Sequence, residues 1–237
     1  MKIIFFVENN HAGGMDSFFA NTLNNWPYLE DELVLICNVD HPGLPNIKTS
    51  AQNKCTFIDH NILISTNLAK KLFFWLPFSF RRILRPFLRV FLMPYQLKKL
   101  KNIFSTIDGD RLLVVNGAYP GGETCRLANI AWTAVKKNQS VHNIRNFAAH
   151  PRLGFNWYEN WIDRKLDKCV HSYVGVSQCC AESLRVRKTF KKSNKIFHIY
   201  NGVESPDNKE RERSPVNLRK KLKLANLLFV LCLQHMR

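Results

Sequence analysis

The sequence predicts an α/β fold, a Rossmann-like parallel sheet with helices on both faces. Short apolar runs alternate along the chain with segments of helical periodicity, which is the pattern of parallel strands joined by crossover helices. The run 111–116 is almost entirely apolar, as expected of a strand buried on both faces. Two glycine-rich stretches, ENNHAGG and NGAYPGG, each follow an apolar run and precede a helical pattern.

Individual elements follow from the same patterns. Seven segments are predicted as strands: 2–7, 32–38, 55–58, 111–116, 139–144, 172–176 and 195–200. Five regions are predicted as helical: 16–24, a basic region around 67–102, 123–136, 157–167 and 178–189. Pro86 and Pro94 lie inside the basic region, so we expect two or three short helices there and not one straight helix.

Charge and cysteine content limit the class of protein. The net charge of +17 predicts an anionic partner, which could be nucleic acid, anionic lipid or a phosphorylated substrate. The seven cysteines are odd in number and contain no C-x-x-C pair, so we predict neither a disulfide framework nor a metal site, and a cytoplasmic location. The first apolar run ends after five residues, too short for the core of a signal peptide.

The first glycine pair, Gly13-Gly14, lies between a predicted strand and a predicted helix. Free backbone N–H groups and the helix dipole favour an anion at such a place. The spacing matches neither G-x-G-x-x-G nor a P-loop. The alternative is a tight turn without a ligand, with Asp16 as the helix N-cap.

Two further segments should reach the same edge of the sheet. NGAYPGGETC, residues 116 to 125, follows the buried strand, and VHNIRNFAAHPR begins in the next strand. The carboxyl ends of parallel strands meet at one edge, where open α/β sheets bind ligands. Arg145 could clamp a phosphate and Asn146 could bond a sugar hydroxyl. His142 is a weak catalytic candidate, since a lone histidine more often has a structural role.

The composition changes after residue 203. The stretch ESPDNKERERSP is polar and carries two prolines, so we predict a linker over 204–215. A short helix and an apolar, strand-like run follow in 216–237. We therefore expect residues 1–203 to form a first domain, and 216–237 to be the first helix and strand of a second domain that is otherwise missing.

The ordered set of motifs resembles the N-terminal domain of GT-B glycosyltransferases of the family 4 type. The shared features are the apolar strand with its G-G loop, the buried strand with its glycine loop, the V-G-V-S that ends at Ser177, and the I-Y-N-G-V that ends at Val203. The YPGGE loop is similar to that of a subset making bacterial surface polysaccharides. The tail resembles the start of that family's second domain.

This resemblance implies a nucleotide-sugar donor as co-substrate, bound mainly by the second domain, with no further cofactor. The Gly13-Gly14 loop would approach the donor phosphate, and Asn201 and Gly202 would form the hinge between two closing domains. Transfer would retain the anomeric configuration. The residues that would form the acceptor side are Asn116, Tyr119, Gly121, Gly122, Glu123 and Asn146.

Two departures from the family affect the catalytic assignment. Arg145 stands where relatives often carry a histidine, which leaves His142 and Arg145 as weak catalytic candidates. The family's donor-binding E-x7-E pair has no counterpart, because Glu204 and Glu212 match the spacing but lie in the predicted linker. We therefore expect the 237-residue chain alone not to transfer sugar.

The basic region combines aromatic and positively charged residues. Residues 70–102 contain nine lysines or arginines and no acid. At 100° per residue the apolar and basic side chains separate onto two faces, typical of a helix in an anionic membrane interface. The predicted membrane-binding residues are Arg81, Arg82, Arg85, Arg89, Phe87 and Phe91. The alternative is a helix packed on the sheet with a solvated basic face; the absence of a recognised motif argues against nucleic acid.

Two functions remain as hypotheses. The first is a glycosyltransferase that acts on a glycan or lipid-linked acceptor in surface polysaccharide biosynthesis, peripheral on the inner face of the plasma membrane. The second is a non-catalytic membrane-surface binding module, or a subunit of a split glycosyltransferase whose C-terminal domain lies on a second chain.

Overall fold

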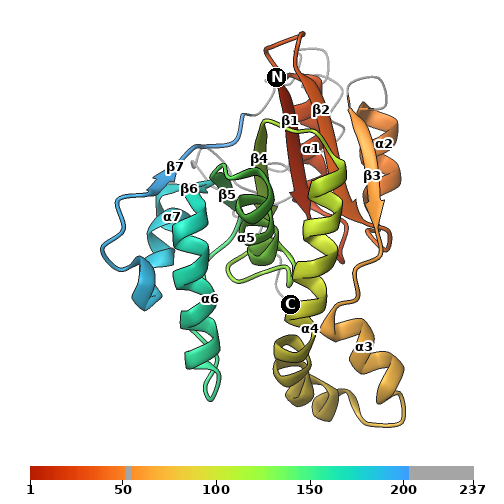
Figure 1. The fold of residues 1–237 in the computed structure, drawn as a ribbon, viewed down its shortest axis with the longest axis vertical. Coiled ribbons are helices and arrows are strands. Elements are labelled where there is room, and N and C mark those ends of the chain that lie inside the picture. The colour runs from red at the N-terminus through yellow and green to blue at the C-terminus, as the bar shows by residue number, and fades with distance from the viewer. Residues whose placement is uncertain (52–54, 203–237) are drawn as a thin grey trace, which may run out of the picture. The chain divides into compact units, whose positions relative to one another are not determined.

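The computed structural model describes residues 1–51 and 55–202, and Met1–Asn201 form one compact unit (Figure 1). Its strands are β1 (Lys2–Val7), β2 (Glu32–Asn38), β3 (Thr56–His60), β4 (Arg111–Asn116), β5 (Ser140–Ile144), β6 (Val170–Gly175) and β7 (Ile196–His198). Its α-helices are α1 (Gly14–Asn24), α2 (Leu44–Ala51), α3 (Ser65–Leu72), α4 (Phe78–Thr106), α5 (Cys125–Lys136), α6 (Asn156–Cys169) and α7 (Gln178–Ser183).

The seven strands form one sheet in the order β3-β2-β1-β4-β5-β6-β7, and every neighbouring pair is parallel. This confirms the predicted fold class. The order reverses at β1, which pairs with β2 on one side and with β4 on the other. In open parallel sheets the loops that leave two such strands diverge to opposite faces and leave a crevice for a ligand.

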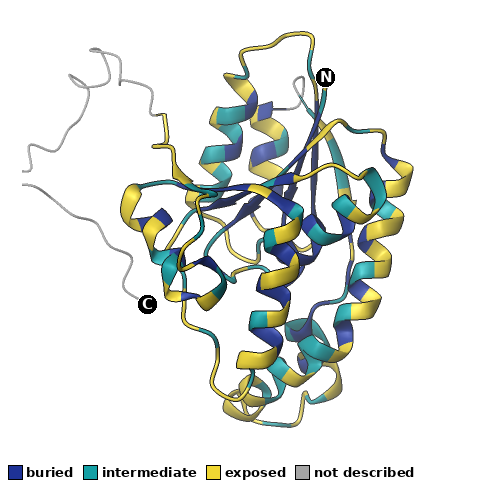
Figure 2. Cartoon of the chain, turned by 60° about the vertical axis from the view of Figure 1, so that its left-hand side comes forward, coloured by how far each residue is buried: buried dark blue, intermediate teal, exposed yellow. Residues whose placement is uncertain are grey.

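Helices cover both faces of the sheet, as predicted, and the inner strands β1, β2 and β4 are mostly buried (Figure 2). In β1, Ile4 and Phe6 belong to the core beneath α4, α5 and α6. Phe5 and Val7 belong to the core beneath α1 and α2. Alternation of this kind follows from the two-residue period of a strand, and it explains why β1 is apolar at nearly every position.

Strand boundaries agree with the sequence prediction within two residues at each end, and β1, β2 and β4 agree fully. Helix α2 was not predicted. Pro45 stands at its second position, where the missing N–H would have no partner within the helix, so the proline is tolerated. The last predicted helix was too long, because α7 ends at Ser183 and two 3₁₀ turns, Leu184–Val186 and Lys188–Phe190, follow it.

The basic region contains two helices, α3 and α4, within the predicted two or three, but the expected break at the prolines was wrong. Helix α4 runs for 29 residues through both Pro86 and Pro94. Each proline removes one hydrogen bond of the helix, but a buried stripe runs along the later part of α4 and holds it against the sheet. The stripe consists of Leu92, Gln96, Leu100 and Phe104.

No helix in residues 1–51 and 55–202 is both long and apolar enough to cross a membrane. The predicted linker 204–215 and the predicted segment 216–237 lie outside the described residues, as does Val203.

Candidate functional site

The candidate site lies at the carboxyl edge of the sheet, where the loops after β1 and β4 meet. Glu8, the first residue after β1, is buried and ties these two loops together. Its carboxylate accepts hydrogen bonds from the N–H of Glu123 at 2.9 Å and of Thr124 at 2.7 Å, and from the Thr124 hydroxyl at 2.6 Å. Burial raises the pKa of Glu8, and the three hydrogen bonds oppose that shift. This contact of Glu8 could not be predicted from the sequence, because Glu123 and Thr124 lie more than a hundred residues away.

Gly13 and Gly14 are exposed at the start of α1, and a side chain at either would meet only open space. Asp16 is the third residue of the helix and not its N-cap, which corrects the expectation. Its carboxylate accepts the Gly13 N–H at 2.8 Å and lies 3.0 Å from Nε2 of His41. The N–H groups of Gly14 and Met15 have no acceptor among the described residues, as is usual for the first N–H groups of a helix.

Arg145, the first residue after β5, packs against α1. Its N–H donates to the carbonyl of Asn116 at 3.0 Å, and its guanidinium lies 3.9 Å from the ring centre of Phe18 in α1. Nη1 is buried without a hydrogen-bond partner in the described chain, and burial lowers the pKa of the group. The positive charge of Arg145 thus lies beside Phe18, one helical turn after Gly14. The neighbouring Asn146 is exposed, and its Oδ1 accepts the N–H of Phe147 at 2.8 Å.

The glycine loop after β4 is held in its conformation by hydrogen bonds within the loop. Asn116 is fully buried; its Nδ2 donates to the carbonyl of Pro120 at 3.0 Å, and its Oδ1 accepts the N–H of Gly122 at 2.9 Å. Gly121 has a φ of 54°, and a Cβ there would lie 1.9 Å from Oδ1 of Asn116. Asn116, Gly121 and Gly122 therefore shape the loop, and the Asn116 side chain is not free to bind an acceptor.

The Tyr119 and Glu123 side chains are also engaged inside the molecule. The Tyr119 hydroxyl donates to Asp163 at 2.5 Å, and the ring has no exposed surface. The Glu123 carboxylate accepts from the N–H and hydroxyl of Ser65 and from Nε2 of Gln96 at 2.6 Å. These contacts correct the expectation that both side chains face an acceptor; Glu123 instead anchors the start of α3 to α4.

His142 is buried in the core, which corrects its prediction as a catalytic candidate. Its Nδ1 lies 2.8 Å from Nδ2 of Asn129, and its Nε2 lies 3.4 Å from Nδ2 of Asn116. Burial, together with the positive charge of Arg126, lowers the pKa of His142 to about 3. A neutral ring without solvent contact cannot exchange a proton with a substrate, so its role is structural.

A polar cavity of about 140 Å³ opens beside these loops, at the carboxyl ends of β1, β2 and β3. Its polar lining consists of Glu8, Asn10, Asn38, Asp40, His60, Asn61 and Asn67. Neutral amides supply both donors and acceptors, which suits a ligand rich in hydroxyl groups.

The imidazole in the lining of this cavity is that of His60, which is buried and stacks on Phe6 at 5.4 Å. Burial lowers its pKa to about 4, and its Nε2 has no partner among the described residues. A neutral imidazole with a free nitrogen can exchange one hydrogen bond with a ligand. This cavity was not predicted from the sequence; the available signal was asparagine at strand ends, since Asn38 is the last residue of β2 and Asn61 directly follows β3.

An apolar surface lies away from the sheet edge. The exposed apolar side chains of the α3–α4 connection and of α4, here called the α4 apolar face, are Phe74, Trp75, Phe78, Phe80, Ile83, Phe87 and Phe91. The predicted arginines are placed differently: only Arg82 is exposed, Arg81 and Arg85 are half-buried, and the Arg89 side chain is 18% exposed and turned toward Glu123. The four arginines therefore do not form one free basic face.

The remaining predicted residues offer fewer contacts. Asn201 and Gly202 are exposed at the end of the described chain. No group of three or more histidine, cysteine, aspartate or glutamate side chains is placed to hold a metal ion in residues 1–51 and 55–202.

Comparison with known proteins adds a structural similarity. No family model matches the chain, and no curated protein sequence matches it. Among solved structures, a crystal structure of UDP-N-acetylglucosamine 2-epimerase aligns with a TM-score of 0.48 and 14% sequence identity over 87% of this chain. The chain covers 53% of that structure, so it spans about half its length. The class assigned here, a Rossmann-like α/β unit with its candidate site at the β1/β4 crevice, rests on the sheet topology.

Proposed function

We propose that this chain is the acceptor-side domain of a nucleotide-sugar-dependent glycosyltransferase of the family 4 type. The observation that carries the proposal is the contact of the Arg145 guanidinium with Phe18 of α1, the helix that begins with the N–H groups of Gly14 and Met15, at the point between β1 and β4 where the strand order reverses. Backbone donors at a helix start and a partly buried arginine together match a diphosphate.

In this proposal the chain binds and positions its substrates. The N–H groups and Arg145 neutralise the donor diphosphate, while a second domain holds the base and the sugar. The asparagine-lined cavity takes the hydroxyl groups of a glycan or of the sugar of a lipid-linked acceptor. The product would belong to a surface polysaccharide. No side chain of the described chain is assigned a proton-transfer role.

Nucleotide binding tests this proposal. In ¹⁵N-resolved NMR of the 237-residue chain, titration with UDP, GDP, ADP and CDP in turn should shift the amide signals of Gly13, Gly14 and Met15 for at least one nucleotide. Arg145→Ala should weaken that binding about tenfold, because a charge-assisted contact is lost. Arg111→Ala is the control, since Arg111 is exposed at the opposite edge of the sheet. The proposal fails if no nucleotide moves these amides, or if both variants bind equally.

We also propose that the protein docks on the inner face of the plasma membrane through the α4 apolar face. Residues 61–107 contain nine basic residues and no acid, so the surroundings of this face complement anionic lipid headgroups. The same face supports the second candidate function, a non-catalytic membrane-surface module or a subunit of a split glycosyltransferase that pairs with a second chain. Nucleotide shifts at Gly13 and Gly14 would distinguish the enzyme from a module that only binds membranes.

A further inference from the structure

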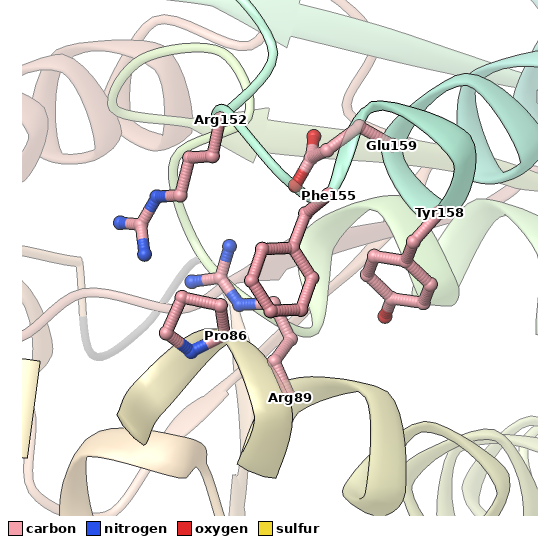
Figure 3. A pocket seen from close by; sticks show the side chains of 6 residues that line it. All are labelled: Pro86, Arg89, Arg152, Phe155, Tyr158 and Glu159. Carbon is pink, nitrogen blue, oxygen red and sulfur yellow. The ribbon is translucent and has the colours of Figure 1, made fainter. Parts of the chain in front are cut away.

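A narrow hollow lies between α4 and the start of α6; in this structure it is too tight to admit a water molecule, so its side chains must move apart to take up a ligand. Its lining residues are Pro86, Arg89, Arg152, Phe155, Tyr158 and Glu159. Figure 3 shows the guanidinium groups of Arg89 and Arg152 turned toward each other across it. Two positive groups have thus been brought together from segments more than sixty residues apart.

The carboxylates near these arginines are already engaged. Glu159 accepts from Arg126 at 2.9 Å and from Arg187 at 2.8 Å. Glu123 accepts from Ser65 and Gln96, and its contact with Nε of Arg89 is a long 3.4 Å. Little negative charge is therefore left for the hollow.

Arg152 is the least satisfied of these groups. Its side chain has no hydrogen bond or ion pair within residues 1–51 and 55–202. Its pKa is lowered first by burial and then by the charge of Arg89, while Glu159 opposes the shift and Arg82 and Arg85 add to it. Arg152 is exposed and the Arg89 side chain is 18% exposed, and two positive groups turned toward each other gain stability when an anion comes between them.

We propose that this hollow binds a phosphate or pyrophosphate group, held between Arg89 and Arg152. Planar guanidinium groups grip phosphoryl oxygens in a bidentate manner, and both side chains are long enough to turn and admit the anion. The site is separate from the donor crevice and does not depend on it. Its ligand is either the phosphate of a membrane-anchored molecule or a soluble phosphate.

The position of the hollow favours the membrane-anchored source. Phe155, one wall of the hollow, makes an edge-to-face contact with Phe87 of the α4 apolar face at 4.9 Å. A molecule whose acyl chain lies in the bilayer against that face would present its phosphate at the level of Arg89 and Arg152. In the proposed enzyme this would be the phosphate of a lipid-linked acceptor, and this assignment rests on the proposed function.

Titration of the full chain with pyrophosphate tests the site. The Nε–Hε NMR signals of Arg89 and Arg152 should shift, and Arg152→Ala should weaken the binding about tenfold. Arg152→Gln, which keeps more of the side chain, should weaken it to a similar extent. Arg164→Ala is the matched control, because Arg164 is an exposed arginine of α6. Unmoved Arg89 and Arg152 signals, or equal binding by the Arg152 and Arg164 variants, would overturn the proposal.

Two further experiments identify the source of the ligand and distinguish this site from the donor crevice. Tighter binding of dihexanoyl phosphatidic acid than of pyrophosphate would identify a lipid phosphate; the reverse order would identify a soluble one. Arg145→Ala should leave the shifts at Arg89 and Arg152 unchanged. If Arg145→Ala abolishes them, the anion binds only in the donor crevice and this proposal is wrong, whatever the fate of the proposed function.

Discussion

Buried charges connect the candidate site to the core of the molecule. Glu159 and Asp163 of α6 accept hydrogen bonds from Arg126 and Arg187 at 2.8 to 3.3 Å, and Asp163 also accepts from the Tyr119 hydroxyl. Such a network gives little net stability over an apolar core, but loss of one member leaves its partners buried and unpaired. It fixes the glycine loop through Tyr119, and it keeps Glu159 from neutralising Arg152.

Glu159→Gln should therefore reduce the free energy of unfolding by about 3–5 kcal/mol at pH 7, measured by urea denaturation. The control is Glu182→Gln, which removes a half-exposed pair with Arg185 and should cost less than about 1 kcal/mol. Similar losses in both variants would contradict the network's role.

The same variant has a defined pH dependence. Burial alone would raise the pKa of Glu159, but the attraction of Arg126 and the hydrogen bonds from Arg126 and Arg187 outweigh it and lower the pKa to about 2. The unfolded carboxyl ionises near 4.5, so the stabilisation is complete above that pH and is lost as the pH falls toward 2. Wild type should lose its advantage over Glu159→Gln in that window; a constant difference would speak against the assignment.

At the scale of the element, α4 presents two apolar sides with different partners. Leu100 and Phe104 are fully buried in the core, whereas Phe91 is 80% exposed. A helix that served only to cover the sheet would gain nothing from its second apolar side. The exposed side is the surface through which membrane docking is proposed.

Alanine substitutions separate the two sides of α4. Leu100→Ala removes a fully buried side chain and should reduce the free energy of unfolding by about 2–5 kcal/mol. Phe91→Ala should change it by less than about 0.5 kcal/mol, because the ring is exposed. Urea denaturation followed by circular dichroism measures both; a large loss in Phe91→Ala would mean that this side packs within the molecule.

At the scale of the whole molecule, the proposed membrane docking can be tested by flotation with lipid vesicles. Wild type should float with phosphatidylglycerol vesicles and be released as salt rises, because screening weakens the attraction of basic residues to headgroups. The double variant Trp75→Ser, Phe91→Ser should lose most of this binding. The control is Tyr28→Ser, Leu29→Ser, which removes two exposed apolar side chains between α1 and β2.

Charge reversal at the one exposed predicted arginine, Arg82→Glu, should weaken vesicle binding without changing the free energy of unfolding. Equal flotation of the wild type, the Trp75/Phe91 variant and the Tyr28/Leu29 variant would rule out docking through the α4 apolar face.

The sequence by itself determined the α/β class, the placement of the seven strands and the meeting of the glycine-rich loops at one edge. Two-residue and 3.6-residue periodicities are local, and the carboxyl ends of parallel strands necessarily share an edge. Gly13 and Arg145 could be anticipated as neighbours for the same reason.

Tertiary structure alone decided where the side chains on these loops point. Glu8 turns to Thr124, Tyr119 to Asp163 and Glu123 to Ser65, each across at least 44 residues. The contacts of Tyr119 and Glu123 remove two predicted ligand-binding side chains from solvent. The same long-range packing buried His142 and turned Arg89 from a membrane face into the hollow beside Arg152. A local pattern shows which residue types are present at an edge, but their partners are set by elements distant in sequence, because burial and pairing are properties of the folded core.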